Sequence, residues 1–207
     1  MNNHVSDPDI SALRSLTSIS PETLERLHRE LEESARRDGV LDIAYRTIDT
    51  PVGTLLLAAT EKGLIRVAYE REDHEKVLEL LATRVSPRIL RSGDRLDKAA
   101  FEIDQYFSGA RKDFDLELDY SLSHGFRQSV QRYLPQIAYG HTQSYAEVAR
   151  IVGNPNAIRA VGTACATNPL PIVVPCHRVI RTDGTLGGYA GGLDAKSLLL
   201  KLESATS

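Results

Sequence analysis

The sequence predicts an α+β fold, with a small, largely antiparallel sheet and its helices in an N-terminal domain and a helical C-terminal domain. Strand-like runs and helical periods alternate over residues 41–120, whereas residues 121–207 hold mainly helical periods and glycine-rich turns. The charge changes at the same place: residues 1–120 carry a net charge of −7 and residues 121–207 one of +4. Residues 1–40 are expected to form a separate N-terminal extension.

The extension is expected to begin with a loose tail over residues 1–19, where no period is clear. Ser20 as a cap and Pro21 at the first helical position then predict a helix from Pro21 to Arg37. Its apolar side is a short stripe of three leucines, namely Leu24, Leu27 and Leu31.

The N-terminal domain is predicted from alternating apolar runs that Gly, Pro and Asp turns separate. These runs predict strands over residues 41–49, 54–60, 64–69 and 114–118. Helical periods predict helices over residues 74–83 and 94–107, the second stopped by Gly109.

The C-terminal domain is predicted to hold helices over residues 126–137, 145–151 and 156–166 and a closing helix over residues 193–202. The tight turn at Gly153-Asn154-Pro155 makes the second and third of these a helix-turn-helix. Pro169, Pro171 and Pro175 predict an extended, helix-free run up to Cys176.

Composition limits the cellular setting. No apolar run has membrane-spanning length and the N-terminus has no apolar signal region, which predicts a cytoplasmic protein with two reduced thiols, Cys165 and Cys176. The spacing of these cysteines and the scattered histidines argue against a zinc site, and no metal or cofactor is expected.

Six arginines and one acid between residues 126 and 181 favour an anionic partner, although a mildly basic surface explains them equally well.

Cys176 is the candidate nucleophile. It lies in Pro175-Cys176-His177-Arg178, and a neighbouring His or Arg lowers the pKa of a thiol. A buried, inert cysteine is the alternative, but core positions seldom continue into two polar side chains. His177 is either a base for this thiol or an ordinary surface histidine.

Two other positions suggest binding. Tyr145 and Arg159 fall on the two helices of the helix-turn-helix, where they would contact a nucleic acid, or merely pack and pair with Glu147. The glycines around Tyr189 do not match a phosphate-binding loop, and they would instead let the backbone approach a flat ligand.

Several motifs in one order closely resemble the O6-alkylguanine-DNA alkyltransferases, also called methylated-DNA–protein-cysteine methyltransferases. They are Gly153-Asn154-Pro155, Arg159 to Gly162, Asn168-Pro169, Ile172 to Val179, and Gly188 to Leu193 with Lys196. The resemblance spans residues 122–204 without gaps, and residues 41–118 fit the family's N-terminal domain, ribonuclease-H-like in outline. The resemblance implies repair of duplex DNA by stoichiometric, irreversible transfer of an alkyl group from guanine O6, with thymine O4 as a further target, by a single-turnover monomer without a cofactor.

The resemblance also implies roles for individual residues. Cys176 accepts the alkyl group, His177 takes its proton through a water, Glu203 orients His177, Asn168 braces the turn and Tyr145 donates to the flipped guanine. The DNA-binding residues would be Arg159, which fills the gap in the base stack, with Tyr145, Ser144, Ala160 and Arg178. The substrate pocket would be lined by Tyr189, Val179, Ala190, Gly191, Pro171 and Cys165.

Departures from the family pattern and competing functions complete the expectations. Ala190 replaces a frequent serine and removes a hydroxyl near guanine O6, while Cys165 and Gly191 predict a roomier pocket open to bulky adducts. Residues 1–120 contain no cysteine, so the zinc site of some relatives is not expected. A lesion-binding or regulatory DNA-binding protein without transfer activity is the first alternative, and a cysteine hydrolase, which would need an oxyanion hole, is the second.

Overall fold

The computed structural model describes residues 20–205, so the expected tail at residues 1–19 lies outside the described residues. Contacts along the chain form two compact units, residues 1–40 and residues 41–207. In the first unit, helix α2 (Pro21–Arg37) has the predicted bounds, and the Ser20 hydroxyl accepts a hydrogen bond from the Thr23 amide at its start. Leu24, Leu27 and Leu31 are exposed along it.

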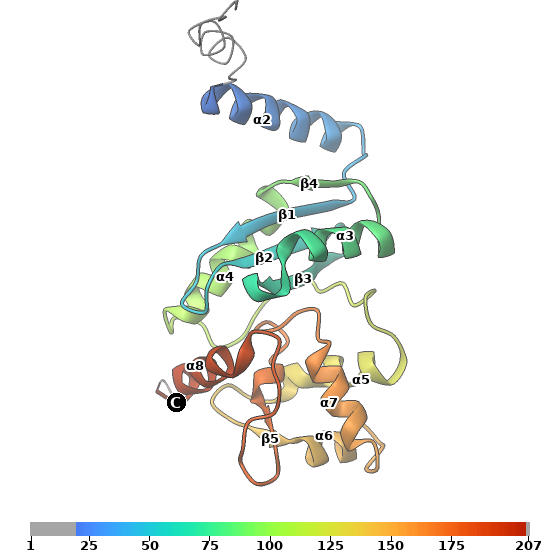
Figure 1. Cartoon of the computed structure of the whole chain (residues 1–207), viewed down its shortest axis with the longest axis vertical. Coiled ribbons are helices and arrows are strands. Elements are labelled where there is room, and N and C mark those ends of the chain that lie inside the picture. The colour runs from blue at the N-terminus through green and yellow to red at the C-terminus, as the bar shows by residue number, and fades with distance from the viewer. Residues whose placement is uncertain (1–19, 206–207) are drawn as a thin grey trace, which may run out of the picture. The chain divides into compact units, whose positions relative to one another are not determined.

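A four-stranded sheet opens the second unit (Figure 1). The spatial order is β3 (Gly63–Tyr69), β2 (Leu55–Thr60), β1 (Ile43–Ile48) and β4 (Ile89–Arg91). The first three strands pair antiparallel, and β4 pairs parallel with β1. The sheet is therefore largely antiparallel, as predicted.

Alternation along β2 explains how the sheet is covered on both faces. Leu55 and Leu57 lie in the larger core cluster with Tyr106 of α4 (Asp97–Phe107), whereas Leu56 packs in a smaller cluster with Leu81 of α3 (His74–Arg84). Helices α3 and α4 thus cover opposite faces (Figure 1). Short 3₁₀ turns precede them, η1 (Glu70–Glu72) and η2 (Asp94–Leu96).

The larger core cluster continues into the C-terminal half, which is mainly helical. The elements are α5 (Gly125–Tyr133), η3 (Leu134–Gln136), β5 (Gln143–Ser144), α6 (Tyr145–Ile151), α7 (Ile158–Ala166), η4 (Cys176–Arg178), β6 (Val179–Ile180) and α8 (Gly192–Ala205). Helices α6 and α7 form the predicted helix-turn-helix, and Gly153 supplies the positive φ of 84° that their turn requires. Among residues 20–205, no helix combines the length and apolarity needed to cross a membrane.

Two local predictions were wrong, and one strand was missed. Residues 114–118 form no strand, because only Leu118 makes an isolated bridge, to Leu64. Strand β4 was not predicted. The run before Cys176 is folded into turns rather than extended: the Val174 amide donates to the Leu170 carbonyl, and Ile172 has a positive φ of 73°.

Candidate functional site

Cys176 lies at the first position of η4, at the end of the folded turn, and only 2% of it is exposed. The turn is braced by one side chain that follows the end of α7. The Asn168 amide donates to the Val174 carbonyl at 2.8 Å and to Cys176 Sγ at 3.1 Å, and its oxygen accepts from the Leu170 amide at 3.0 Å. The position of the sulfur is therefore fixed by a side chain eight residues earlier in the chain.

His177 and Glu203 form a buried pair beside this cysteine, although Glu203 carried no local signal in the sequence. Nε2 of His177 lies 2.8 Å from Oε1 of Glu203, and neither residue is more than 1% exposed. A carboxylate can only accept, so Nε2 carries the proton and Nδ1 presents a lone pair. Among the described residues, this buried Nδ1 has no hydrogen-bond partner.

Arg178 was expected to contact DNA, and its place in the structure contradicts this. Its guanidinium is buried and donates from Nη2 and Nε to the Glu203 carboxylate at 2.9 and 3.0 Å, while Nη1 donates to the Ile137 carbonyl. Each nitrogen of the guanidinium already donates a hydrogen bond inside the protein, so the buried side chain is not placed to contact a DNA backbone. It also directs its charge at Glu203 rather than at the thiol.

Burial dominates the chemistry of the thiol. It raises the pKa of Cys176 to about 11, and the Asn168 hydrogen bond and the Lys196 charge oppose this shift without cancelling it. His177 and Arg178 are not among the groups that lower the pKa of the buried thiol. The expectation that they lower it was therefore wrong. Burial likewise lowers the pKa of His177, which keeps the ring neutral near pH 7. A neutral thiol beside a neutral imidazole requires a proton transfer before the sulfur can react.

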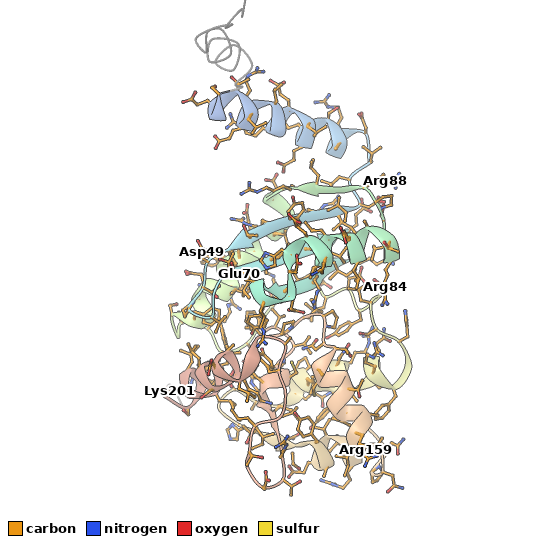
Figure 2. The ribbon with its side chains drawn as sticks, in the orientation of Figure 1. Asp49, Glu70, Arg84, Arg88, Arg159 and Lys201 are labelled. Atoms are coloured by element: carbon orange, nitrogen blue, oxygen red, sulfur yellow. The ribbon has the colours of Figure 1, made fainter. Side chains whose placement is uncertain are left out.

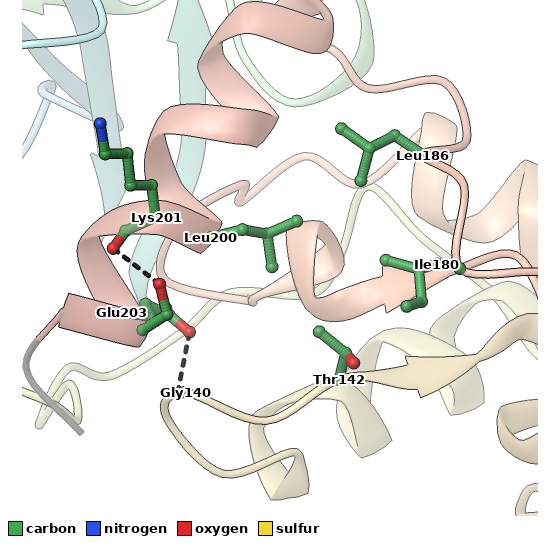
Figure 3. A pocket seen from close by; sticks show the side chains of 9 residues that line it. Gly140, Thr142, Ile180, Leu186, Leu200, Lys201 and Glu203 are labelled. Carbon is green, nitrogen blue, oxygen red and sulfur yellow. Dashed lines mark hydrogen bonds between the residues drawn. The ribbon is translucent and has the colours of Figure 1, made fainter.

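The pKa of Glu203 is set by its hydrogen bonds rather than by its burial. Burial alone would raise the pKa of this carboxyl, but hydrogen bonds from His177 and Arg178 outweigh it and lower the pKa to about 2. One more donor, which the sequence did not suggest, comes from the N-terminal half: the Tyr106 hydroxyl of α4 donates to Oε1 at 2.7 Å. The Gly140 amide donates to Oε2 at 3.2 Å (Figure 3).

A cavity of about 350 Å³ borders Glu203 on the side of Gly140 (Figure 3). Apolar side chains from β6, the following turn and α8 contribute most of its wall, with a threonine opposite them. The lining residues are Gly140, Thr142, Ile180, Gly184, Leu186, Leu200, Lys201, Glu203 and Ser204. Cys176 does not line this cavity.

The expected pocket residues lie around the turn, but not all of them open it. Tyr189 stands edge-on to His177 with ring centroids 6.4 Å apart, and its hydroxyl lies 2.9 Å from that of Tyr69 on β3. A Cβ on Gly191 would come within 2.6 Å of the Tyr69 ring. The space beside Gly191 is thus already filled, and the prediction that this glycine opens the pocket to bulky adducts was wrong.

The other expected pocket residues are Pro171, Cys165 and Val179, which are buried, and Ala190, which is half-buried. The Val179 carbonyl accepts from the fully buried Lys196 Nζ at 2.6 Å. Burial lowers the pKa of this lysine. Its ammonium therefore occupies the main-chain acceptor of one of the expected pocket residues.

The helix-turn-helix presents a mixed surface. Arg159 is exposed on α7 (Figure 2). Ala160, the next residue of this helix, is exposed as well. The Ser144 hydroxyl is engaged in the capping box at the start of α6, where it donates to Glu147 at 2.7 Å. Tyr145 is half-buried, and burial raises the pKa of its hydroxyl to about 12, so the group remains a donor. Within residues 20–205, no three His, Cys, Asp or Glu side chains are placed to hold a metal ion.

Comparisons with known proteins agree with this architecture. Residues 43–120 match the family described as the ribonuclease-like domain of 6-O-methylguanine DNA methyltransferase, and residues 125–205 match its DNA binding domain. The chain is similar to a methylated-DNA–protein-cysteine methyltransferase of Methanosarcina barkeri, with 42% identity over 159 residues, covering 77% of this chain and 96% of the relative.

Solved structures agree as well. The crystal structure of the Mycobacterium tuberculosis O6-methylguanine methyltransferase matches with a TM-score of 0.70 and 37% identity, over 80% of this chain and 94% of that one. The same organism's OGT in complex with DNA matches with a TM-score of 0.69 and 38% identity, over 79% and 94%. These matches confirm the predicted α+β fold. The chain belongs to the O6-methylguanine DNA methyltransferase family.

Proposed function

We propose that this protein repairs alkylated duplex DNA by moving the alkyl group from O6 of guanine to Cys176, irreversibly and once per molecule. The observation that carries the proposal is the buried Cys176–His177–Glu203 arrangement in the same compact unit as a helix-turn-helix. Membership of the family and the DNA complex of a relative support the reaction and the partner. Transfer from thymine O4 is a narrower part of the same proposal.

The reaction balances with the groups at hand. The thiol proton passes through a water to Nδ1 of His177, the sulfur attacks the alkyl carbon, and the carbon–oxygen bond breaks with its electron pair going to guanine. Guanine takes up one proton, so the net change is a thiol proton exchanged for an alkyl group. The thioether is stable and no step in the site regenerates the thiol, which limits each molecule to one transfer.

The substrate has to reach a sulfur that is 2% exposed. Guanine O6 lies inside the base stack, so the nucleotide must be flipped, which costs a few kcal/mol. Arg159, exposed on α7, is proposed to fill the gap, and Tyr145 to donate a hydrogen bond to the flipped base. Ala160 and Ser144 are proposed to lie at the DNA backbone, and Tyr189 to line the alkyl pocket.

The organisation of the chain is part of the proposal. We assign residues 1–40 to an extension, residues 41–120 to the N-terminal domain and residues 121–207 to the domain for DNA binding and transfer. A monomer in the cytoplasm is proposed, without a resident metal or cofactor.

The test is the mass of the intact protein, and of its peptides, after mixing with excess duplex that carries one O6-methylguanine. The expected result is one methyl per protein, located on the Cys176 peptide and not on the Cys165 peptide. Undamaged duplex and the Cys176→Ala variant should give no mass gain.

Each other result has a definite meaning. Tight binding of the lesion without a mass gain would support the non-transferring alternative instead. Repeated, DNA-independent hydrolysis of a simple ester would favour the hydrolase. If the protein neither takes up the methyl group nor binds the lesion, the proposed function is refuted.

A further inference from the structure

Tyr106 is a fully buried tyrosine on α4, in the N-terminal half, that reaches the candidate active site of the C-terminal half. Its hydroxyl donates to Oε1 of Glu203 at 2.7 Å and lies 3.5 Å from Nε2 of His177. Burial, followed by the negative charge of Glu203, raises the pKa of this hydroxyl far above its ordinary value. The group therefore remains a hydrogen-bond donor at every pH at which the protein works.

The ring and the hydroxyl of Tyr106 make separate contacts. The ring packs against Phe107, Phe114 and Tyr139, with centroid distances of 5.4, 5.4 and 6.1 Å. A phenylalanine would keep these contacts. The hydroxyl adds nothing to this packing, and its short hydrogen bond goes to the carboxylate that holds His177.

Glu203 Oε1 is surrounded by three donors from two elements. It accepts from Tyr106 on α4, and from His177 and Arg178 on η4. With this oxygen held on several sides, its distance and direction to His177 Nε2 are fixed. The imidazole is then kept in the tautomer whose Nδ1 carries the lone pair.

We propose that Tyr106 is a positioning residue for alkyl transfer: its hydroxyl holds the Glu203 carboxylate so that His177 presents Nδ1 as the acceptor of the Cys176 proton. This inference rests on the proposed function, but its structural part does not require DNA. It assigns to the N-terminal domain a direct share in the reaction.

The sign of the expected effect follows from the hydrogen bond. A donor on Glu203 draws electron density from the carboxylate, which then stabilises a protonated His177 less. Removing the hydroxyl should therefore raise the pKa of His177. The titratable and charged groups around His177 are Glu203 and Lys196 of α8, Cys176 and Arg178 of η4, Tyr106 of α4, and Tyr189 of the glycine-rich loop.

The first measurement follows the ring nitrogens of His177 by NMR in the free, full-length protein. The wild type should show the Nε2–H tautomer and titrate below the ordinary histidine range. In Tyr106→Phe the midpoint should rise by about 0.7 pH unit, equivalent to a net hydrogen bond of ordinary strength. The matched control is Thr60→Val, which also removes a hydroxyl that donates to a carboxylate at 2.7 Å, here Asp119.

The second measurement is the single-turnover rate of methyl transfer between pH 5 and 9. In Tyr106→Phe the low-pH limb should move upward by the same amount, and the plateau rate should fall about fivefold. The affinity for undamaged duplex should not change, because Tyr106 is buried away from any DNA surface. Thr60→Val should follow the wild type in both measurements.

The outcomes separate the two proposals. An unchanged His177 titration and an unchanged pH–rate profile in Tyr106→Phe would reduce Tyr106 to a packing residue and overturn the inference. A shifted titration in a protein whose wild type transfers nothing would uphold the positioning and refute the proposed function. Should Tyr106→Phe not unfold cooperatively in urea, fluorotyrosine at this position provides the test. It donates more strongly, so the His177 midpoint should fall, and an unshifted midpoint would again overturn the inference.

Discussion

Glu203 is the residue on which the buried polar network depends. Its carboxylate accepts from two neighbours of the nucleophile, His177 and Arg178, and from Tyr106 and the Gly140 amide. Isolated, this carboxylate would be strongly destabilised by burial, and so would the guanidinium of Arg178. Each charge is tolerated because the other is present, so the loss of one exposes the full desolvation cost of its partner.

Glu203→Gln is therefore expected to lower the free energy of unfolding at pH 7 by about 3 to 5 kcal/mol, the usual result of leaving a buried partner charge unpaired. Urea unfolding of the full chain measures this. The control is Glu61→Gln, because Glu61 meets Arg95 only at 3.7 Å and its side chain is 81% exposed. That variant should unfold at the wild-type midpoint.

The destabilisation by Glu203→Gln is expected to depend on pH. The pKa of Glu203 is lowered from 4.5 to about 2, so its stabilising contribution is complete above pH 4.5 and is lost as the pH falls toward 2. The stability gap between wild type and Glu203→Gln should narrow over that window. A gap that stays constant from pH 7 to pH 2.5 would show that the carboxylate is not held in its charged form by the fold.

Sequence reasoning at this scale succeeds where the signal is local. Cys176 and His177 are adjacent, and a proline precedes them, so a motif can indicate them. Glu203 lies 26 residues beyond His177, and Tyr106 lies 97 residues before Glu203. Only the packing of α4 and α8 brings these side chains together, and the periodicity of the sequence does not predict that packing. The resemblance indicated Glu203 but not Tyr106.

At the scale of elements, the glycine-rich loop is tightly fitted rather than open. A Cβ on Gly187 would overlap the Tyr145 hydroxyl, whereas one on the adjacent Gly188 would meet nothing within 4 Å. Neither glycine is among the positive-φ residues of the chain. The two positions therefore differ in contact and not in backbone strain.

Gly187→Ala is expected to displace Tyr145 and to lower the single-turnover transfer rate about tenfold or more, since overpacking of this kind costs about 1–3 kcal/mol. Gly188→Ala is the matched control and should transfer at nearly the wild-type rate. Circular dichroism would confirm that both variants are folded. Equal rates in the two variants would mean that the position of Tyr145 does not matter for transfer.

The elements that sequence reasoning found were those with strong periods, such as α3, α4 and the helix-turn-helix. Strand β4 was missed because its three residues follow Ser86-Pro87-Arg88, and its pairing with β1 is parallel and non-local. The alternation over residues 114–118 is real, but most of this segment finds no strand partner. An alternating run predicts a strand only where a neighbour is available to pair with it.

At the scale of the whole molecule, the two family domains share one core and one site. The larger core cluster contains Leu57 of β2 as well as Leu199 of α8. The Val67 amide of β3 donates to the Pro169 carbonyl in the turn before Cys176 at 2.8 Å. Together with the hydrogen bond from Tyr106 to Glu203, these contacts make the N-terminal half a support for the active-site turn. The two halves are therefore not structurally independent domains.

Residues 121–207 expressed alone are therefore expected not to unfold cooperatively and to transfer methyl groups at least about tenfold more slowly than the full chain. The fragment would expose the apolar surface that α4 and β2 cover, and it would leave Glu203 without one of its donors. Residues 41–207 are the control, because they form a compact unit by themselves and should retain both properties. Thermal unfolding and single-turnover rates on the same O6-methylguanine duplex measure the difference. A fragment 121–207 that melts cooperatively and matches the rate of residues 41–207 would show that the contacts from the N-terminal half are incidental to the reaction.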